Sequence, residues 1–399
     1  MYSLKPIIER QVSLEEAEES INQWFEVNNT SYQVDTFGNN IALSIVTILD
    51  ENNQSCVGCG KGNIKESVIG AKYEAYEHFM ALKYLREFSD IYDSQRIINQ
   101  SIFNNFLPLK ILNSKKNSKI SALYFSHDHI NKKDLFFPSF LIDYKYSNNP
   151  KIKDDSDYAS ARRYSCGTGL AVGYNYEEAA IHAVSEVIER HCIGRFLAEK
   201  FFHKINSQIN IINNDSLSQE LKETISAAQK YIKDDILLID VSIKGLLPVF
   251  IACTKNKRIS NINLLGGGCS FYPSYAAKRA ITELVQQHLV NDNVKSVKDD
   301  WQSHYNHLIK YPKLLRCLAA DMDQVEYSFI NLQKDPHILD LPIHLDHIRN
   351  KCVYLNLPVW VKELKKEFNG ISTVCAVMPN MERFSIVSLG GYVVPTNKY

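Results

Sequence analysis

The sequence lacks an excess of charge of either sign, because 45 basic residues are balanced by 45 acidic ones. A protein that binds duplex nucleic acid or an anionic membrane usually carries a basic surplus, so neither partner is expected here. The sequence also lacks an apolar run of the roughly 20 residues that span a bilayer. Residues 1–11 do not show the charged and then apolar pattern of a secretory signal. We therefore expect a cytoplasmic protein with no membrane or nucleic-acid partner.

Cysteine, proline and glycine are too sparse to define linkers or a disulfide framework. The nine cysteines are an odd number scattered along the chain, and Cys56-x-x-Cys59 lacks the second ligand pair of a zinc site. The 12 prolines and 16 glycines do not gather into a linker. With 45% hydrophobic residues, the chain can bury a large core. Residues 1–399 are therefore expected to form a single domain.

The hydrophobic periodicity predicts a mixed fold, α/β or α+β. Strands are expected at 41–49, 136–142, 236–241, 248–254, 262–265, 353–357 and 372–378. Helices are expected at 13–25, 67–86, 176–200, 274–290 and over much of 295–350. The polar stretches 113–134 and 146–157 are interpreted as surface loops. Residues 247–265 read as a hairpin that ends in a glycine turn at 266–268.

Three of the expected helices carry polar residues along one face, at offsets of three and four. A single such pair of glutamates is usually a solvated helix face. Several carboxylates facing inward, however, need cations, arginines or water, because an unpaired buried carboxylate is costly. Magnesium prefers oxygen ligands and shares them with substrate phosphates, so the pattern favours a Mg-nucleotide site. The residues are Glu74 and Glu77, then Glu178, His182, Glu186, Glu189 and Arg190, and finally Arg279, Glu283 and Gln286.

Glycines precede the first two of these helices, at 60–62 and at 165–173. Glycine turns before helices can bring backbone N–H groups close to a phosphate, and Lys61 could add a point charge. Neither segment fits the P-loop pattern G-x-x-x-x-G-K-[ST] or the dinucleotide pattern G-x-G-x-x-G. A nucleotide site of another kind is therefore indicated.

These segments resemble the signatures of the YcaO family. The first signature is matched by Gly60-Lys61-Gly62 with Gly70-Ala71-x-x-Glu74-Ala75-x-Glu77, within 55–85. The second is matched by Ser165 to Gly173, Glu177-Glu178-Ala179 and Glu186-Val187-Ile188-Glu189-Arg190, within 160–200. The third is matched by Arg279-Ala280-x-x-Glu283-x-x-Gln286, within 260–290, and Pro379 fits the late strand-Pro segment of the family. Residues 300–399 would complete the fold.

The resemblance implies an α/β fold with ATP and Mg²⁺ in a cleft lined by these helices. It implies metal ligation by Glu74, Glu77, Glu186, Glu189 and Glu283. It implies nucleotide contacts from Lys61, Ser165, Glu74, Glu178, Glu186, Arg190, Arg279, Glu283 and Gln286, of which Arg190, Arg279 and Gln286 would act in catalysis. Arg10 is a weaker candidate for a residue of this site.

Members of the family activate a backbone amide of a peptide or protein with ATP. A cyclodehydratase lets a Cys, Ser or Thr side chain of the substrate attack, which gives a thiazoline or oxazoline, whereas an external sulfur donor gives a thioamide. Other open alternatives are a kinase or amide ligase that holds Mg-ATP in the same way, and a non-catalytic scaffold. A separate leader-binding or activating partner is expected, and a homodimer remains possible.

Three positions depart from the pattern of the family. His78 stands where arginine is frequent, and Tyr174 stands where asparagine is frequent. The C-terminal residues 392–399 lack the alternating prolines of many azoline-forming members. The last departure shifts weight toward thioamide formation or a divergent role.

Overall fold

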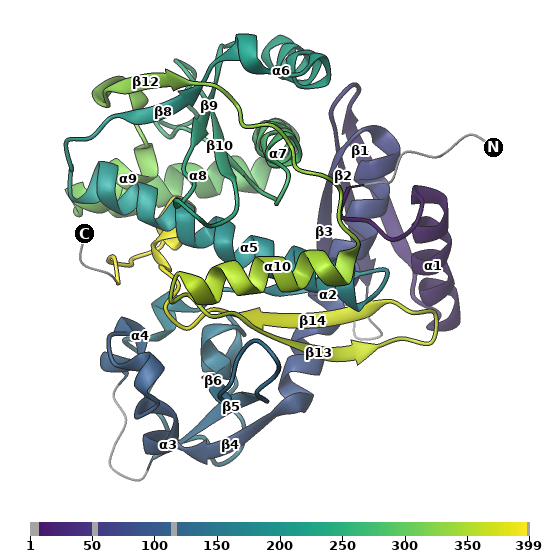
Figure 1. Ribbon diagram of the computed structural model, residues 1–399, viewed down its shortest axis with the longest axis vertical. Coiled ribbons are helices and arrows are strands. Elements are labelled where there is room, and N and C mark those ends of the chain that lie inside the picture. The colour runs from purple at the N-terminus through teal and green to yellow at the C-terminus, as the bar shows by residue number, and fades with distance from the viewer. Residues whose placement is uncertain (1–7, 50–54, 113–117, 397–399) are drawn as a thin grey trace.

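The computed structural model describes residues 8–49, 55–112 and 118–396, and the strands in these ranges form four sheets (Figure 1). Three of the sheets contribute a strand that is followed in sequence by a long helix lying on the same sheet. We call these the strand–helix units. They are β3 (Ser55–Gly62) with α2 (Ile64–Phe88), β7 (Leu170–Gly173) with α5 (Tyr176–Leu197), and β11 (Leu265–Cys269) with α7 (Pro273–Asn293).

The first unit belongs to an antiparallel sheet in the order β1-β2-β3, formed by β1 (Tyr32–Gly38), β2 (Ala42–Leu49) and β3. The helix α1 (Leu14–Val27) packs against α2. Asn63 begins α2, and its side chain accepts a hydrogen bond from the Glu66 backbone while Glu66 caps the Asn63 N–H. This capping box explains why the helix begins earlier than the expected residue 67.

Glycines 58, 60 and 62 lie within β3, so the expected turn at 60–62 is wrong. A Cβ on Gly60 would lie 1.8 Å from the carbonyl oxygen of Ser67, and one on Gly58 would lie 2.1 Å from the nitrogen of Ala75. Both glycines are therefore required so that α2 can lie directly on the strand. The signal read as a phosphate turn is a signal of close helix–strand contact.

Another antiparallel sheet is formed by β4 (Ser89–Asp93), β5 (Lys119–Phe125) and β6 (Leu135–Pro138). The short helices α3 (Ser94–Ile98) and α4 (Leu107–Lys110) lie between β4 and β5 in the sequence. The strand β5 lies inside the stretch 113–134 that was expected to be a loop, and residues 113–117 of that stretch lie outside the described residues. The strand expected at 136–142 ends at Pro138, because a 3-10 turn follows at Ser139–Leu141.

The central unit packs α5 on β7 and β14 (Ser372–Val377), in a sheet ordered β13-β14-β7 whose outer strand is β13 (Trp360–Lys366). The helix α5 continues into a π-helical turn at Ala198–Phe202. The helix α10 (Leu341–Tyr354) packs against α5. The strand expected at 353–357 is wrong: it covers the end of α10 and the turn at Asn356, whose φ is 57°.

The third unit belongs to a five-stranded sheet ordered β11-β10-β9-β8-β12. Its other strands are β8 (Ile209–Ile212), β9 (Ile236–Asp240), β10 (Val249–Thr254) and β12 (Tyr327–Ile330), and its helices are α6 (Gln219–Ile232), α7, α8 (Lys295–Leu308) and α9 (Pro312–Ala319). The expected hairpin is confirmed as β10 and β11, which pair antiparallel. Its second strand begins only at Leu265, so glycines 266–268 lie in the strand and not in a turn.

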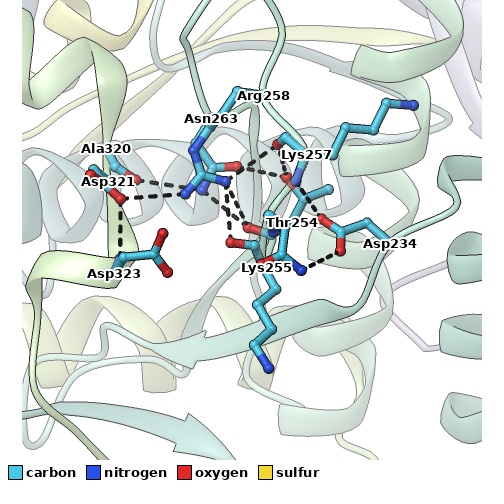
Figure 2. A network of polar contacts seen from close by, with 10 residues as sticks. Asp234, Thr254, Lys255, Lys257, Arg258, Asn263, Ala320, Asp321 and Asp323 are labelled. Carbon is cyan, nitrogen blue, oxygen red and sulfur yellow. Dashed lines mark hydrogen bonds and ion pairs between the residues drawn. The ribbon is translucent and has the colours of Figure 1, made fainter.

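A network of polar contacts fixes the loop between β10 and β11 (Figure 2). Asp234, just after α6, accepts a hydrogen bond of 2.7 Å from the backbone nitrogen of Asn256. On the other side, Nη2 of Arg258 lies 3.5 Å from Oδ1 of Asp321, just after α9. Asn263 donates to the carbonyl oxygen of Ala320 over 3.4 Å. The loop is thereby tied to segments on both sides of it.

The three strand–helix units meet in the middle of the molecule (Figure 1). The helix α2 contacts β7, α5 contacts β11, and α7 contacts β3, so each helix also touches a strand of another unit. No helix in the described ranges is long and apolar enough to cross a bilayer.

Candidate active site

The acidic stripes of α2, α5 and α7 face one another where the three units meet. On α5, the carboxylate of Glu186 accepts a hydrogen bond of 2.9 Å from the backbone N–H of Gly169, which holds this side chain against the end of the 165–169 turn. Nε of Arg190 lies 4.0 Å from carboxylate oxygens of both Glu186 and Glu189. One guanidinium therefore stands between two carboxylates of the stripe.

Residues of α7 connect this stripe to β3. Lys61, on β3, forms an ion pair with Glu283. The other oxygen of Glu283 accepts a hydrogen bond of 3.3 Å from the N–H of Gly267. Gln286 donates from Nε2 to the carbonyl oxygen of Cys59 over 3.2 Å. The third stripe thus lies against the strand that leads into the first.

Glycine at position 267 allows Glu189 to approach β11. A Cβ at this position would lie 2.9 Å from Oε1 of Glu189. Because Gly266 and Gly268 face α7 while Gly267 faces α5, the glycine run lets two helices lie against one strand. The run therefore helps to bring the stripes of α5 and α7 together.

Burial raises the pKa of most of the clustered carboxylates. The pKa of Glu77 lies well above its usual value, because burial and the charges of Glu186 and Glu74 act in the same direction. Burial also raises the pKa values of Glu74, Glu186 and Glu189. Carboxylates in such a place are stabilised by added positive charge, and a divalent cation supplies it.

Basic side chains partly neutralise the cluster. Burial alone would raise the pKa of Glu283, but the charges of Lys61 and Arg190 outweigh it and lower the pKa. Burial opposes the charged form of Arg190, yet Glu189 and Glu186 hold its pKa above the usual range. His182 is neutral by contrast, because burial and nearby cations lower its pKa well below the usual value.

Arg279 has an unused hydrogen-bond donor in the cluster. Its Nε is buried and has no hydrogen-bond partner in the described part of the chain. The pKa of Arg279 is raised, since Tyr275, Glu189 and Glu9 outweigh the effect of burial. A buried guanidinium donor without a partner is costly, and a phosphate oxygen would satisfy it. The residues present therefore fit a bound nucleotide.

The opposite end of the α5 stripe is covered by residues near the N-terminus. Arg10 donates from Nη1 to Glu178 over 2.9 Å, and the backbone N–H of Gln11 donates to the same carboxylate over 3.1 Å. Glu9 is buried and accepts a hydrogen bond of 2.6 Å from the hydroxyl of Ser270. The sequence analysis noted Arg10 but missed Glu9 and Gln11, because a short irregular segment shows no periodicity.

Two of the expected nucleotide contacts stand apart from the centre of the cluster. Ser165 donates its hydroxyl to the carbonyl oxygens of Phe140 and Asp143, so its hydrogen bonds hold the loop. Glu74 lies at the rim with its side chain 40% exposed, and Nε2 of His78 lies 3.9 Å from its carboxylate. The roles of both residues stay predictions.

The protein side chains alone do not form a metal site. In the ranges that the structure describes, no group of three or more His, Cys, Asp or Glu side chains is arranged to hold a metal ion. Magnesium usually takes only one or two carboxylates and completes its shell with water and substrate phosphates. The arrangement therefore fits a metal that enters together with a nucleotide.

A cavity of about 320 Å³ adjoins the cluster at the Arg190 end of α5. Glu77, Glu186 and Arg190 form one part of its lining, and Cys166, Gly167 and Thr168 form another. Its size lies in the range of about 300–1,000 Å³ typical of ligand pockets. The carboxylate cluster thus has a space beside it that a second ligand can enter.

Comparisons with known proteins agree with this fold. The structure of YcaO from Methanopyrus kandleri bound with AMPPCP and Mg²⁺ is similar with a TM-score of 0.68 and 15% identity, over 99% of this chain and 99% of that chain. A heterocyclase in complex with substrate and cofactor gives a TM-score of 0.66 and 16% identity, over 95% of this chain and 54% of that chain. The E. coli microcin synthetase McbBCD complex with pro-MccB17 bound gives 0.58 and 14%, over 89% and 88%. These likenesses confirm the mixed fold.

The family model described as YcaO cyclodehydratase, ATP- and Mg²⁺-binding, matches residues 60–382. A search of curated proteins found no match. The family match includes all three strand–helix units and confirms the expectation of ATP and Mg²⁺ as cofactors. The chain belongs to the YcaO family of ATP-dependent enzymes.

Proposed function

We propose that the protein uses Mg-ATP to activate a backbone amide of a peptide, and that it acts as a cyclodehydratase that forms thiazoline or oxazoline rings. The observation that carries the proposal is the convergence of carboxylates from α5 and α7 on the guanidinium groups of Arg190 and Arg279, with Glu77 of α2 beside Glu186. Bound Mg-ATP supplies the phosphoryl group that turns the amide oxygen into a leaving group. In-line phosphoryl transfer needs charge neutralisation and positioning more than acid–base chemistry.

The acidic residues of the cluster would bind the metal ions, and the basic residues would bind the phosphates. Glu74, Glu77, Glu186, Glu189 and Glu283 would hold the metal ions. Arg190 and Arg279 would donate to phosphate oxygens, and Arg279 would satisfy its unused Nε by doing so. Lys61 and Gln286, at the junction of β3 and α7, would complete the phosphate contacts, and Glu178 would contact the rest of the nucleotide near Arg10. Ser165 would act from the adjoining turn.

The second candidate is thioamide formation with an external sulfur donor, which uses the same activated amide. Residues 392–396 contain one proline, Pro395, and so do not themselves show the alternating prolines of azoline-forming members. Part of this segment is held in place: the N–H of Val394 donates to the Tyr164 hydroxyl over 3.2 Å, and the N–H of Thr396 donates to Glu382 over 3.0 Å.

A peptide substrate and a separate partner protein are part of the proposal. The similar structures support it, since one holds a heterocyclase with substrate and cofactor and another holds the McbBCD complex with pro-MccB17. A partner that binds the leader of the substrate would set which peptide is modified. We propose that the reaction takes place in the cytoplasm, where ATP and reduced thiols are supplied.

Mass spectrometry of a candidate precursor peptide tests the proposal. The peptide is incubated with the protein, its partner, ATP and Mg²⁺, and ADP and phosphate are measured in parallel. A loss of about 18 Da at each modified site indicates azoline formation, and a gain of about 16 Da indicates a thioamide. A stable phosphorylated peptide would instead show a kinase.

Two variants show whether the carboxylate cluster is responsible for ATP binding and turnover. Glu186→Gln removes a carboxylate charge from the cluster and is expected to abolish Mg-dependent ATP binding and turnover. Glu199→Gln is the matched control. Glu199 lies in the π-helical turn after α5 and pairs with Arg195, so its replacement should leave ATP binding and turnover unchanged. Nucleotide binding without any change of peptide mass would favour a scaffold.

A further inference from the structure

The cavity beside Arg190 is lined by charged, polar and apolar residues. The charged residues are Glu77, Glu186 and Arg190, on α2 and α5, and the polar residues include His78 on α2. The apolar residues include Leu82 on α2, Leu170 on β7, and Ile386 and Leu389 on the 3-10 helix Phe384–Leu389. These four apolar side chains offer a ligand neither a charge nor a hydrogen bond.

The position of the cavity along α5 separates it from the other end of the stripe. Glu178, which pairs with Arg10, and Arg190, which lines the cavity, are separated by twelve helical residues, or about 18 Å at 1.5 Å per residue. The carboxylate cluster lies between them. A nucleotide whose phosphates reach Glu186 and Arg190 would therefore border the cavity, and the space beside Leu82, Leu170, Ile386 and Leu389 would remain for another ligand.

We infer that this cavity receives the substrate residue whose carbonyl is activated, and that it selects an uncharged, apolar side chain there. The inference rests on the proposed function, because the reacting carbonyl must reach the phosphate end beside Arg190. With the carbonyl directed to Arg190, the side chain of the same residue lies against Leu82, Leu170, Ile386 and Leu389. A charged side chain would lose its water there without gaining a partner. The selection holds for azoline and for thioamide formation, since both start at the same carbonyl.

The cavity contains its own reporter of occupancy. Cys166 lines the cavity, is partly accessible, and receives a hydrogen bond of 3.2 Å from Nη1 of Arg383. Cys56 and Cys59 are also partly accessible but do not line the cavity, so they report on general reactivity. A peptide in the cavity should slow the alkylation of Cys166 and leave the other two thiols unchanged.

The test measures alkylation of the full chain by iodoacetamide, with peptide mapping by mass spectrometry. The probes are the blocked tetrapeptides Gly-Leu-Ser-Gly, Gly-Asp-Ser-Gly and Gly-Lys-Ser-Gly at millimolar concentration, with and without Mg²⁺ and a non-hydrolysable ATP analogue. We expect the leucine peptide to slow alkylation of Cys166 at least threefold, and the charged peptides to have less than half of this effect. Equal rates with all three peptides would overturn the inference.

Variants of an exposed residue of the cavity lining test whether the apolar residues contact the peptide. Leu389 is 59% exposed, so Leu389→Lys should fold, and it is expected to remove the protection given by the leucine peptide. Leu389→Ser removes the contact without adding charge and should weaken the protection in the same direction. Val27→Lys, at a residue 61% exposed at the end of α1, is the matched control and should keep it. Protection that survives both changes at Leu389 contradicts the inference.

The assay separates this inference from the proposed function. If the leucine peptide protects Cys166 but the precursor peptide keeps its mass in the presence of ATP, the selection by the cavity stands and the proposed reaction is wrong. If the precursor mass changes without selective protection of Cys166, the proposed reaction stands and the selection by the cavity is wrong.

Discussion

The carboxylate of Glu283 is held ionised by its neighbours, although its surroundings favour the neutral form. Lys61 forms the ion pair with it, and the N–H of Gly267 donates to its second oxygen. Glu283 would hold a divalent cation that entered with the nucleotide, and Lys61 would then be available to a phosphate oxygen. One lysine would thus serve the site with and without its ligand.

Replacing Lys61 by methionine is expected to weaken binding of Mg-ATP about tenfold or more, because a charge-assisted contact worth about 1.5–3 kcal/mol is lost. Isothermal titration calorimetry with Mg²⁺ and a non-hydrolysable ATP analogue measures the change. Lys65→Met is the control, since Lys65 pairs with Glu15 on the exposed side of α2 and should not affect the nucleotide. Equal affinities of the two variants would remove Lys61 from the site.

Residue types and spacing were enough to predict most of the candidate site. The three stripes were found because offsets of three and four place side chains on one face of a helix. The contact of Glu9 with Ser270 joins an irregular segment to a strand end more than 250 residues later, and no local pattern encodes such a contact. Ser165 was found by its position in the signature, yet its hydroxyl is bound to backbone carbonyls of the preceding loop.

At the scale of elements, each long helix of the site lies on a strand that contains glycine. The absence of a Cβ brings the helix backbone next to the strand backbone, so the stripes are set by backbone contact and not by side-chain packing. The positions of the carboxylates are therefore fixed by rigid parts of the fold.

Gly60→Ala is expected to destabilise the protein by about 3 kcal/mol or more, because the added methyl group would overlap the backbone of α2 at Ser67. Urea denaturation measures the free energy of unfolding. Gly70→Ala is the paired control. Gly70 lies on α2, on the other side of this contact, and a Cβ there would meet only the Cα of Gly60 at 3.6 Å. This change should stabilise the protein by about 0.5–1 kcal/mol, since glycine disfavours a helix. A loss of similar size in both variants would contradict the close contact.

The helices were predicted better than the strands. The ranges expected for α2, α5 and α7 lie close to the observed ones, because long periodic segments keep their pattern over many turns. The glycine runs were taken for turns, because glycine weakens strand propensity and only the helix on top of the strand explains its presence. Residues 353–357 were taken for a strand, but the first two belong to α10 and the others form the turn that follows it.

At the scale of the whole molecule, the cluster makes the empty fold sensitive to pH. Folding raises the pKa values of Glu74, Glu77, Glu186 and Glu189 above 4.5, so the folded state holds their protons more tightly than the unfolded state does. Their ionisation therefore lowers the free energy of unfolding as the pH rises through the raised values. Glu283 acts in the opposite direction, since its lowered pKa gives stability that is lost as the pH falls below 4.5.

We expect the melting temperature without ligand to fall as the pH rises above 4.5, and the stabilisation by Mg-ATP to grow in the same direction. The metal binds the ionised carboxylates, so its binding releases protons. Scanning calorimetry with and without Mg-ATP measures both trends, and a free ligand at about 100 times Kd adds about 2.7 kcal/mol. Glu77→Gln should flatten the slope without ligand, because it removes the carboxyl group with the largest upward shift. A slope that is unchanged in this variant would reject the explanation.

We propose that the described residues behave as one domain, because the site takes residues from each of the three strand–helix units. The unit order along the chain has a consequence for synthesis on the ribosome. The α7 contribution, with Arg279, Glu283 and Gln286, emerges long after α2 has left the exit tunnel. Until then Arg190 alone stands beside Glu186 and Glu189, and Lys61 lacks Glu283, the carboxylate with which it pairs in the finished fold. A chain released before α7 would therefore carry an incomplete cluster in which Lys61 has lost this partner.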